Sequence, residues 1–133
     1  MIALDTNVLA RLVTKDDPAQ ARAAAQLIDA GEACFVPITV ALELEWVLRG
    51  VYELDRESIT KSFHALLGVR NLHFEREAAV LEAVRLLDQG VDFADALHHA
   101  AAANCDSLRT FDRKLLGRAA SLGLTPPVRM VGD

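Results

Sequence analysis

The sequence is poor in cysteine, in aromatic residues and in long hydrophobic runs. Its two cysteines among 133 residues, Cys34 and Cys105, lie far apart and fit no CxxC pattern, which disfavours a disulfide framework or a thiolate zinc site. We expect both thiols to be reduced and buried. No apolar run approaches the roughly 20 residues of a membrane span, and the start, MIALDTNVLA, lacks the basic region of a signal peptide. These absences predict a cytoplasmic protein.

Positive charge is also scarce. The chain has 14 lysines and arginines against 19 acidic residues, a net charge of −5. A broadly basic nucleic-acid-binding surface is excluded by this balance, because non-specific binding to phosphates depends on Lys and Arg. Any action on nucleic acid would have to be local or rely on metal cations. What the chain does have is 52% hydrophobic residues, enough for a core, and its length predicts a single domain over residues 1–133.

Short β-like runs alternate with longer helical ones along the chain. Strands separated by helices are typical of parallel βαβ units covered by helices. The sequence therefore predicts an α/β fold with three layers, α/β/α, and a small, mostly parallel central sheet. The expected strands are 2–4, 33–36, 71–74, 107–110 and 128–131; the expected helices are 7–14, 18–30, 39–50, 56–67, 76–89, 93–104 and 113–122.

Acidic residues follow the predicted strands or begin the predicted helices. Asp5 ends the first strand and Asp112 follows the strand 107–110, so a parallel sheet should bring both to one edge, where ligands collect. Asp95 lies in the first turn of a helix. Glu43 lies on a helix within an apolar run and should be partly buried, whereas Glu45 should lie on a solvated face. Helix capping and dipole interactions are the alternative roles for such aspartates.

Converging carboxylates would need a cation. Two carboxylates 4 Å apart repel by about 4 kcal/mol at an effective dielectric constant near 20, so three or four acids require protonation or a metal. Hard oxygen ligands without Cys or His select Mg²⁺ or Mn²⁺ over zinc. The adjacent pair His98 and His99 does not have the i, i+4 spacing of a helical zinc pair, so we expect packing or surface roles for both.

Four blocks carry a family resemblance over essentially the whole chain. They are LDTNVL at 4–9, ALELEWVLR at 41–49, DFADALHHAAA at 92–102 and TFDRKL at 110–115. In this order and spacing they resemble the PIN-domain family and, within it, the VapC-type toxins of type II toxin–antitoxin pairs. The resemblance implies an endoribonuclease dependent on Mg²⁺ or Mn²⁺, in which the metal activates a water for attack on an RNA phosphodiester.

The resemblance also assigns roles to residues. It implies that the catalytic and metal-binding acids are Asp5, Glu43, Asp95 and Asp112, with Asp92 as a further metal ligand. Thr6, Asn7 and Thr110 match residues that support the acids. Nearby cations are candidates for phosphate contact, although solvated surface charge is the commoner role for such residues: Arg11, Lys15, Arg49, Arg113 and Lys114.

The resemblance implies partners as well: an RNA substrate, a cognate antitoxin that blocks the site, and a second copy in a homodimer. The main alternative is a PIN-like protein-binding module with a vestigial site, against which the four intact acids count. A receiver-like phosphoacceptor domain would need an early acidic pair and a late lysine after a strand, and neither is in the required place.

Overall fold

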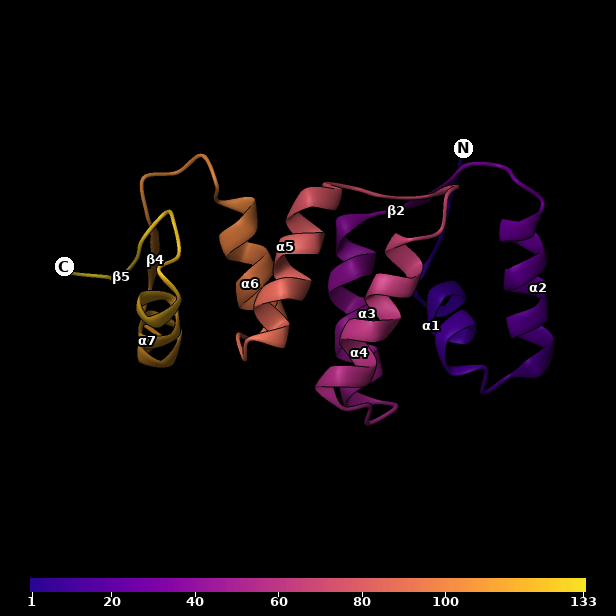
Figure 1. The fold of residues 1–133 in the computed structure, drawn as a ribbon, viewed down its shortest axis with the longest axis horizontal. Helices are drawn as coiled ribbons and strands as arrows, with labels where there is room; N and C mark the ends of the chain where they lie inside the picture. Colours follow the sequence, from indigo (N-terminus) through magenta and orange to yellow (C-terminus); the bar gives the residue numbers. More distant parts are fainter.

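A computed structural model describes all residues, 1–133, as an elongated row of helices with short strands (Figure 1). Helix α2 lies at one end, followed by α1, the pair α3 and α4, then α5 and α6, with the C-terminal elements β4, α7 and β5 at the other end. The elements are β1 (Ile2–Ala3), α1 (Thr6–Thr14), α2 (Pro18–Asp29), β2 (Cys34–Val36), α3 (Ile38–Gly50), α4 (Arg56–Leu67), β3 (Leu72–Phe74), α5 (Glu77–Asp88), α6 (Phe93–Ala101), β4 (Leu108–Thr110), α7 (Arg113–Leu122) and β5 (Val128–Met130).

Local sequence signals explain where the helices begin. The side chain of Asp17 accepts a hydrogen bond from the Gln20 amide, with Pro18 at the first helical position of α2. Asp55 likewise accepts from the amide of Ser58 at the start of α4. Every helix and strand expected from the sequence is present with bounds that differ by at most three residues, which confirms the α/β class.

The strands form two small sheets rather than one. Parallel pairing joins β1 to β2 and β2 to β3, with Ile2 opposite Cys34 and Cys34 opposite Leu72. A separate parallel pair, β4 and β5, has Leu108 opposite Val128. The strands are parallel, as expected, but β1 and β4 each lie at an open edge and are not neighbours. Strand pairing is non-local, so the order of strands does not follow from periodicity.

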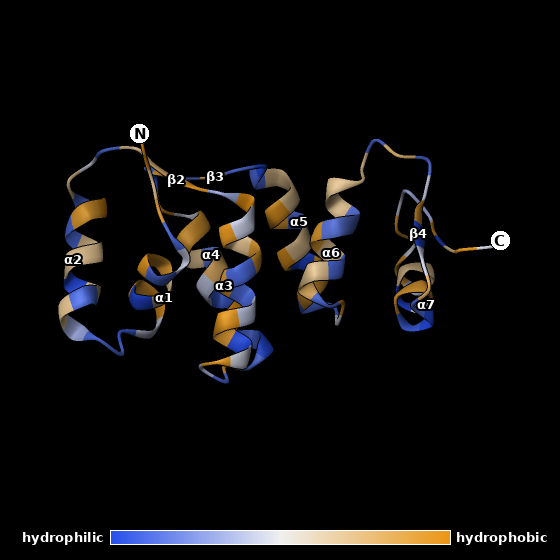
Figure 2. Cartoon of the chain, turned by 180° about the vertical axis from the view of Figure 1, so that it is seen from behind, coloured by the Kyte–Doolittle hydropathy of each residue, from blue (hydrophilic) through white to orange (hydrophobic).

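The core is a single cluster of 28 buried residues that extends from α1 to β5. Its largest members include Phe63 of α4 and Phe93 of α6, whose ring centroids lie 5.1 Å apart. Figure 2 shows hydrophobic residues alternating with hydrophilic ones along the helices, the pattern of amphipathic helices that bury one face. Leu115, Ala119 and Val128 bring the C-terminal elements into this core.

One expectation about the cysteines is wrong. Cys34 is buried in β2, but Cys105 is exposed in the turn between α6 and β4. The apolar residues around Cys105 are alanines at a helix end, which do not provide enough bulk to cover it. None of the seven helices combines the length and the apolar character needed to cross a membrane.

Truncating a core leucine should destabilise the chain far more than truncating an exposed one. Leu44 is fully buried, whereas Leu81 of α5 is 47% exposed. We expect Leu44→Ala to lower the free energy of unfolding by about 2–5 kcal/mol, because it removes buried methyl groups and leaves a cavity. The matched Leu81→Ala change should cost less than about 1 kcal/mol. Urea denaturation followed by circular dichroism measures both, and equal losses would contradict the assigned core.

Candidate active site

A strongly charged concavity lies between α3, α4, α6 and α7. It has a volume of about 510 Å³ and is lined by 13 residues, of which eight are charged. Four of these are acidic and four are basic: Glu45, Asp92, Asp95 and Asp112; Arg49, Arg56, Lys114 and Arg118. We call this concavity the acid pocket. Three of its acids are among the five metal-binding acids that the sequence predicts.

Helix starts hold the three aspartates of the acid pocket. Asp92 caps α6 and accepts a hydrogen bond from the Asp95 amide at 3.2 Å. Asp112 caps α7, where its Oδ1 accepts from the amides of Lys114 at 2.9 Å and Leu115 at 3.2 Å. The amide of Asp112 in turn donates to Oγ1 of Thr110 at 2.9 Å. Capping therefore fixes the orientation of the Asp92 and Asp112 carboxylates, and Asp95 lines the same pocket from the first turn of α6.

The acids of the pocket influence one another electrostatically. The pKa of Asp95 is raised above its ordinary value, chiefly because the carboxyl is partly buried and also because the charges of Asp92 and Asp112 lie nearby; His98 opposes the shift. Such a raised pKa means that the ionised form of Asp95 is disfavoured in the folded chain. A cation bound among these three carboxylates would relieve that penalty.

A second group of predicted site residues lies at the start of α1. Asp5 caps this helix, accepting a hydrogen bond from the Thr6 amide at 2.8 Å. The buried Thr6 donates its hydroxyl proton to Glu43 of α3, so Thr6 links the two acids. Asn7 is exposed beside a separate, smaller hollow between α1 and α2. None of these four residues lines the acid pocket.

The expectation that Asp5 and Asp112 share one sheet edge is therefore not met. Asp5 follows β1 and Asp112 follows β4, and the two strands belong to different sheets. The structure brings Asp92, Asp95 and Asp112 together, and it separately brings Asp5 and Glu43 together through Thr6. No three side chains of His, Cys, Asp or Glu converge closely enough to form a complete metal site.

Both strands that precede these acids have a free backbone edge. The amides of Ile2 and Leu4 bond to Ala33 and Phe35 of the β2 side, so the backbone groups of Ala3 between them point to the open side. In β4, the Leu108 amide bonds to Pro127 and the Thr110 carbonyl accepts from Val131. The backbone groups of Arg109 consequently point to the open side of the second sheet.

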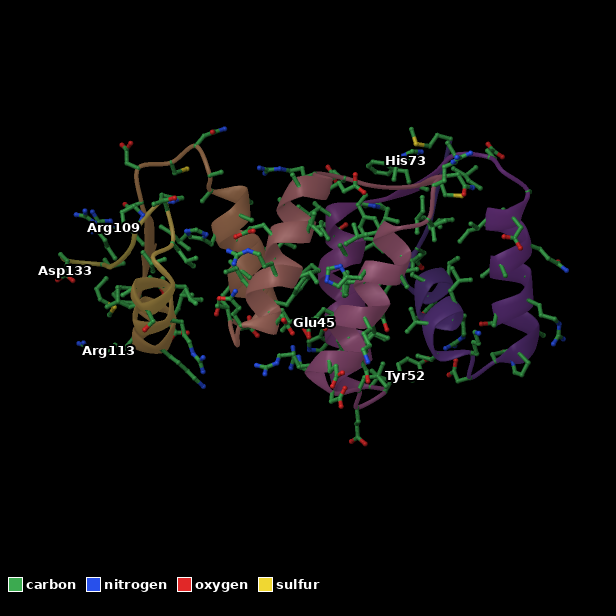
Figure 3. The ribbon with its side chains drawn as sticks, viewed as in Figure 1. Glu45, Tyr52, His73, Arg109, Arg113 and Asp133 are labelled. Atoms are coloured by element: carbon green, nitrogen blue, oxygen red, sulfur yellow. The ribbon has the colours of Figure 1, made fainter.

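The expected burial of the two glutamates of α3 is reversed. Glu43 is exposed, and Glu45 is only 3% exposed and lines the acid pocket. Figure 3 shows Glu45 on the side of α3 that faces α5 and α6. Helical spacing explains the difference, because residue 45 lies on the same stripe as three buried neighbours: Ala41, Leu44 and Leu48. Reading that stripe in the sequence would have identified Glu45.

Glu45 is neutralised by a neighbour on its own helix. Its carboxylate accepts from Nε of Arg49 at 2.9 Å and from Nη2 at 3.3 Å. The Glu45 carboxylate keeps the pKa of Arg49 above its ordinary value, mainly through this hydrogen bond. Glu45 therefore lines the acid pocket as one partner of an ion pair, whereas Asp92, Asp95 and Asp112 have no salt-bridge partner.

The histidines are not placed as metal ligands. His99 is buried, and its Nε2 lies 2.8 Å from the carbonyl oxygen of Pro126, joining α6 to the segment before β5. His98 is exposed on the same helix. This agrees with the packing and surface roles expected of the pair.

Of the five basic residues expected to contact phosphate, Arg49 and Lys114 line the acid pocket. Arg11 is held by Asp16 at 3.1 Å and by the hydroxyl of Tyr52, outside the acid pocket. Two arginines that line the acid pocket were missed: Arg56 at the start of α4 and Arg118 in α7. No local pattern marks them, because they come from helices that are remote in the sequence.

The donor chemistry of the acid pocket suits a divalent cation such as Mg²⁺ or Mn²⁺. Its three unpaired donors are carboxylates, whose hard oxygens these ions prefer, and no thiol lines the pocket. The pKa of Asp95 is raised first by partial burial and then by the charges of Asp92 and Asp112, and a nearby cation would offset both effects. The residues present therefore fit the ion chemically, although they do not by themselves form a closed coordination shell.

Comparison with known protein families gives one match. The family model of the PIN domain matches residues 2–121, from β1 into the last turn of α7. A search of curated proteins finds no significant match. The family match, together with seven helices and short parallel strands, confirms the predicted PIN-like, three-layer α/β/α class.

The raised pKa of Asp95 predicts a stability change that depends on pH. A carboxyl whose pKa is higher in the folded than in the unfolded chain favours folding at low pH, and this contribution is lost as the pH rises through the folded pKa. In buffer without divalent metal, Asp95→Asn should therefore be more stable than the natural chain at pH 7. The advantage should shrink as the pH falls toward about 3.9, the ordinary value for Asp.

Urea denaturation at a series of pH values measures this difference. Asp106→Asn is the matched control, because Asp106 is exposed in the turn before β4 and outside the acid pocket. A natural chain as stable as Asp95→Asn at every pH would show that the three carboxylates do not interact as described.

Proposed function

The chain belongs to the PIN-domain family, whose members are generally metal-dependent nucleases, and we propose that it is an endoribonuclease and the toxin of a type II, VapC-type toxin–antitoxin pair. The proposed reaction is hydrolysis of RNA phosphodiester bonds with Mg²⁺ or Mn²⁺. The observation that carries the proposal is the acid pocket, in which three unpaired aspartates share one space with basic side chains. An anionic substrate and a cation can both be bound there.

The proposed site consists of Asp5, Glu43, Asp95 and Asp112, with Asp92 as a further ligand. When bound, the metal ion would lower the pKa of a water and stabilise charge on the scissile phosphate and its leaving 3′ oxygen. The chain's own residues would hold that ion and orient it. Thr6 and Thr110 support the acids through hydrogen bonds to Glu43 and to the Asp112 amide, respectively.

All five acids can act together only if the two open sheet edges meet. We infer that the free edge of β1 pairs in parallel with the free edge of β4 when the site forms. This pairing requires β4, α7 and β5 to move from their place at the end of the row, because α3 to α6 lie between β4 and β1 in the structure (Figure 1). The register that places Ala3 opposite Thr110 lets the free backbone groups of Ala3 bond to Arg109 and Phe111. That register also aligns Asp5 with Asp112, since each lies two residues further along its strand. A cation between them would offset their repulsion.

The partners we propose are an RNA substrate, a cognate antitoxin that covers the site, and a second copy of the chain in a homodimer. The alternative is a PIN-like protein-binding module with a vestigial site. The raised pKa of Asp95, caused first by burial and then by the charges of Asp92 and Asp112, counts against it, because a site without function has no reason to retain an unpaired carboxyl whose ionised form is disfavoured.

Removing single acids tests the proposed reaction. Asp5→Asn, Asp95→Asn and Asp112→Asn should each lower cleavage of a labelled single-stranded RNA by at least about 100-fold, the usual effect of losing a group that acts on the reacting centre. Gel analysis of the products with Mn²⁺, with Mg²⁺ and with EDTA measures the effect. EDTA should abolish cleavage by the natural chain.

The two glutamates of α3 provide a matched pair within this experiment. Glu43→Gln should abolish cleavage as the aspartate changes do, whereas Glu45→Gln should chiefly lower stability, because Glu45 is buried and already bound to Arg49. Full activity in Asp5→Asn and Glu43→Gln, combined with loss in Asp112→Asn, would restrict the reaction to the acid pocket. Activity in all of them would refute the proposed site.

Cross-linking tests the pairing of β1 with β4. Adjacent strands lie about 4.8 Å apart, within the usual range for a disulfide. We expect Ile2→Cys combined with Arg109→Cys, in a Cys105→Ser background, to form a disulfide under mild oxidation, with a higher yield when Mg²⁺ is present. Non-reducing gels separate a bond within one chain from a bond between two copies, and peptide mass mapping identifies it.

The control pair combines Arg22→Cys with Arg109→Cys in the same background. Arg22 is exposed on α2, at the end of the molecule opposite β4 (Figure 1), so only random collision would join these positions. A yield for the Ile2 and Arg109 pair that does not exceed the control would contradict pairing of the two edges.

A further inference from the structure

Two guanidinium groups from different helices meet at one glycine on the wall of the acid pocket. Gly90 lies between α5 and α6 with a φ of +92°. A Cβ at this residue would lie 2.7 Å from Nη1 of Arg118 and 3.5 Å from Nη1 of Arg56. The absence of a side chain at Gly90 therefore makes the space into which both arginines reach.

Neither of these arginines has an acidic partner. The five ion pairs of the chain involve Arg11, Arg49, Lys61, Arg85 and the N-terminal amine. Arg56 and Arg118, both exposed, therefore reach the same point as like charges with no ion-pair partner, although the pocket contains four carboxylates. Two like charges at close range repel each other. An anion between them would turn this repulsion into attraction.

The geometry of a guanidinium favours one kind of anion. Its planar fork donates two parallel hydrogen bonds to a phosphate or carboxylate. Lys114 lines the same pocket, also without a salt-bridge partner, and adds a third positive charge. The nearby aspartates would repel a carboxylate ligand and an isolated phosphate alike. A nucleic-acid strand carries several phosphates, so it can contact the arginines and a cation held by the acids at the same time. A strand could meet the arginines with one phosphate and the acids with the next.

We propose that Arg56 and Arg118 form a clamp for a phosphate of a single-stranded RNA, next to the phosphodiester that the acids address. This assignment rests on the proposed ribonuclease function and identifies where its substrate is held. The clamp explains how a chain with a net charge of −5 binds RNA: positive charge is left unpaired where the strand must lie. Arg56 and Arg118 are positioning residues, since they contact the backbone beside the reacting atoms.

Binding can be measured without cleavage. The probe is a fluorescein-labelled single-stranded RNA in buffer with EDTA, and anisotropy gives the dissociation constant at several salt concentrations. We expect Arg56→Gln and Arg118→Gln each to weaken binding about 5- to 20-fold at low salt. Each should also reduce the slope of log K against log salt by about 0.7, the value for one phosphate contact on a single strand.

Matched variants separate the clamp from general charge. Arg22→Gln removes the same charge from an exposed position on α2 and should change binding less than about 2-fold, because α2 lies at the end of the molecule opposite α7 (Figure 1) and salt screens charges over a Debye length of about 8–10 Å. Arg56→Lys and Arg118→Lys keep the charge but lose the fork, so they should retain most of the salt slope while losing affinity. Thermal melting checks that each variant is folded. Equal effects of Arg22→Gln and the two clamp variants would overturn the proposal, as would full affinity in the lysine variants.

Cleavage assays distinguish a failure of the clamp from a failure of the ribonuclease function. If the chain cleaves RNA, Arg56→Gln and Arg118→Gln should raise KM with little change in kcat, the pattern for lost uniform binding. If the natural chain does not cleave RNA with any metal but binds it through the arginines, the clamp stands and the ribonuclease function fails. Cleavage with unchanged KM in both variants overturns the clamp alone.

Discussion

The first amides of a helix have no carbonyl partner within that helix, and this requirement fixes where most of the candidate acids lie. Five helices of the chain begin with an aspartate that accepts a backbone N–H: Asp5, Asp17, Asp55, Asp92 and Asp112. Each hydrogen bond sets the direction of its carboxylate relative to the helix. Three of the five are acids of the candidate site, so the contacts that start α1, α6 and α7 also aim its oxygen atoms. The arrangement of the site then follows from how these helices pack.

The elements of the fold could be predicted because their signals are local. Asp17 followed by Pro18 marks a helix start, and positive-φ glycines such as Gly90 mark chain reversals. Strand order could not be predicted, because pairing of β1 or β4 depends on segments remote in the chain. For the same reason the sequence predicted a single sheet edge for Asp5 and Asp112. The acids themselves were recognisable from four motif blocks, whereas their division into two groups was not.

The wrong burial predicted for the two glutamates of α3, and the failure to predict Arg56 and Arg118, have other physical origins. The outward position of Glu43 and the inward position of Glu45 follow from helical spacing within α3, whose buried face carries Ala41, Leu44 and Leu48. Arg56 and Arg118 are harder to predict from the sequence, because the feature that distinguishes them is the absence of an ion-pair partner. Unpaired charge is a property of the folded molecule as a whole. No pattern within α4 or α7 distinguishes Arg56 or Arg118 from solvated surface residues.

The open edges of β1 and β4 are two and three residues long. An exposed edge ordinarily invites any extended chain to add a strand, which is a route to aggregation. Edges this short offer a foreign strand only a few hydrogen bonds, too few to offset the entropy of ordering it. In the pairing proposed above, β1 and β4 would run in the same direction, and Asp5 and Asp112 would lie together at one end of the two strands. Under that proposal, the shortness of both edges would disfavour strands that contribute backbone hydrogen bonds alone and favour the one strand that also brings a carboxylate to a bound cation.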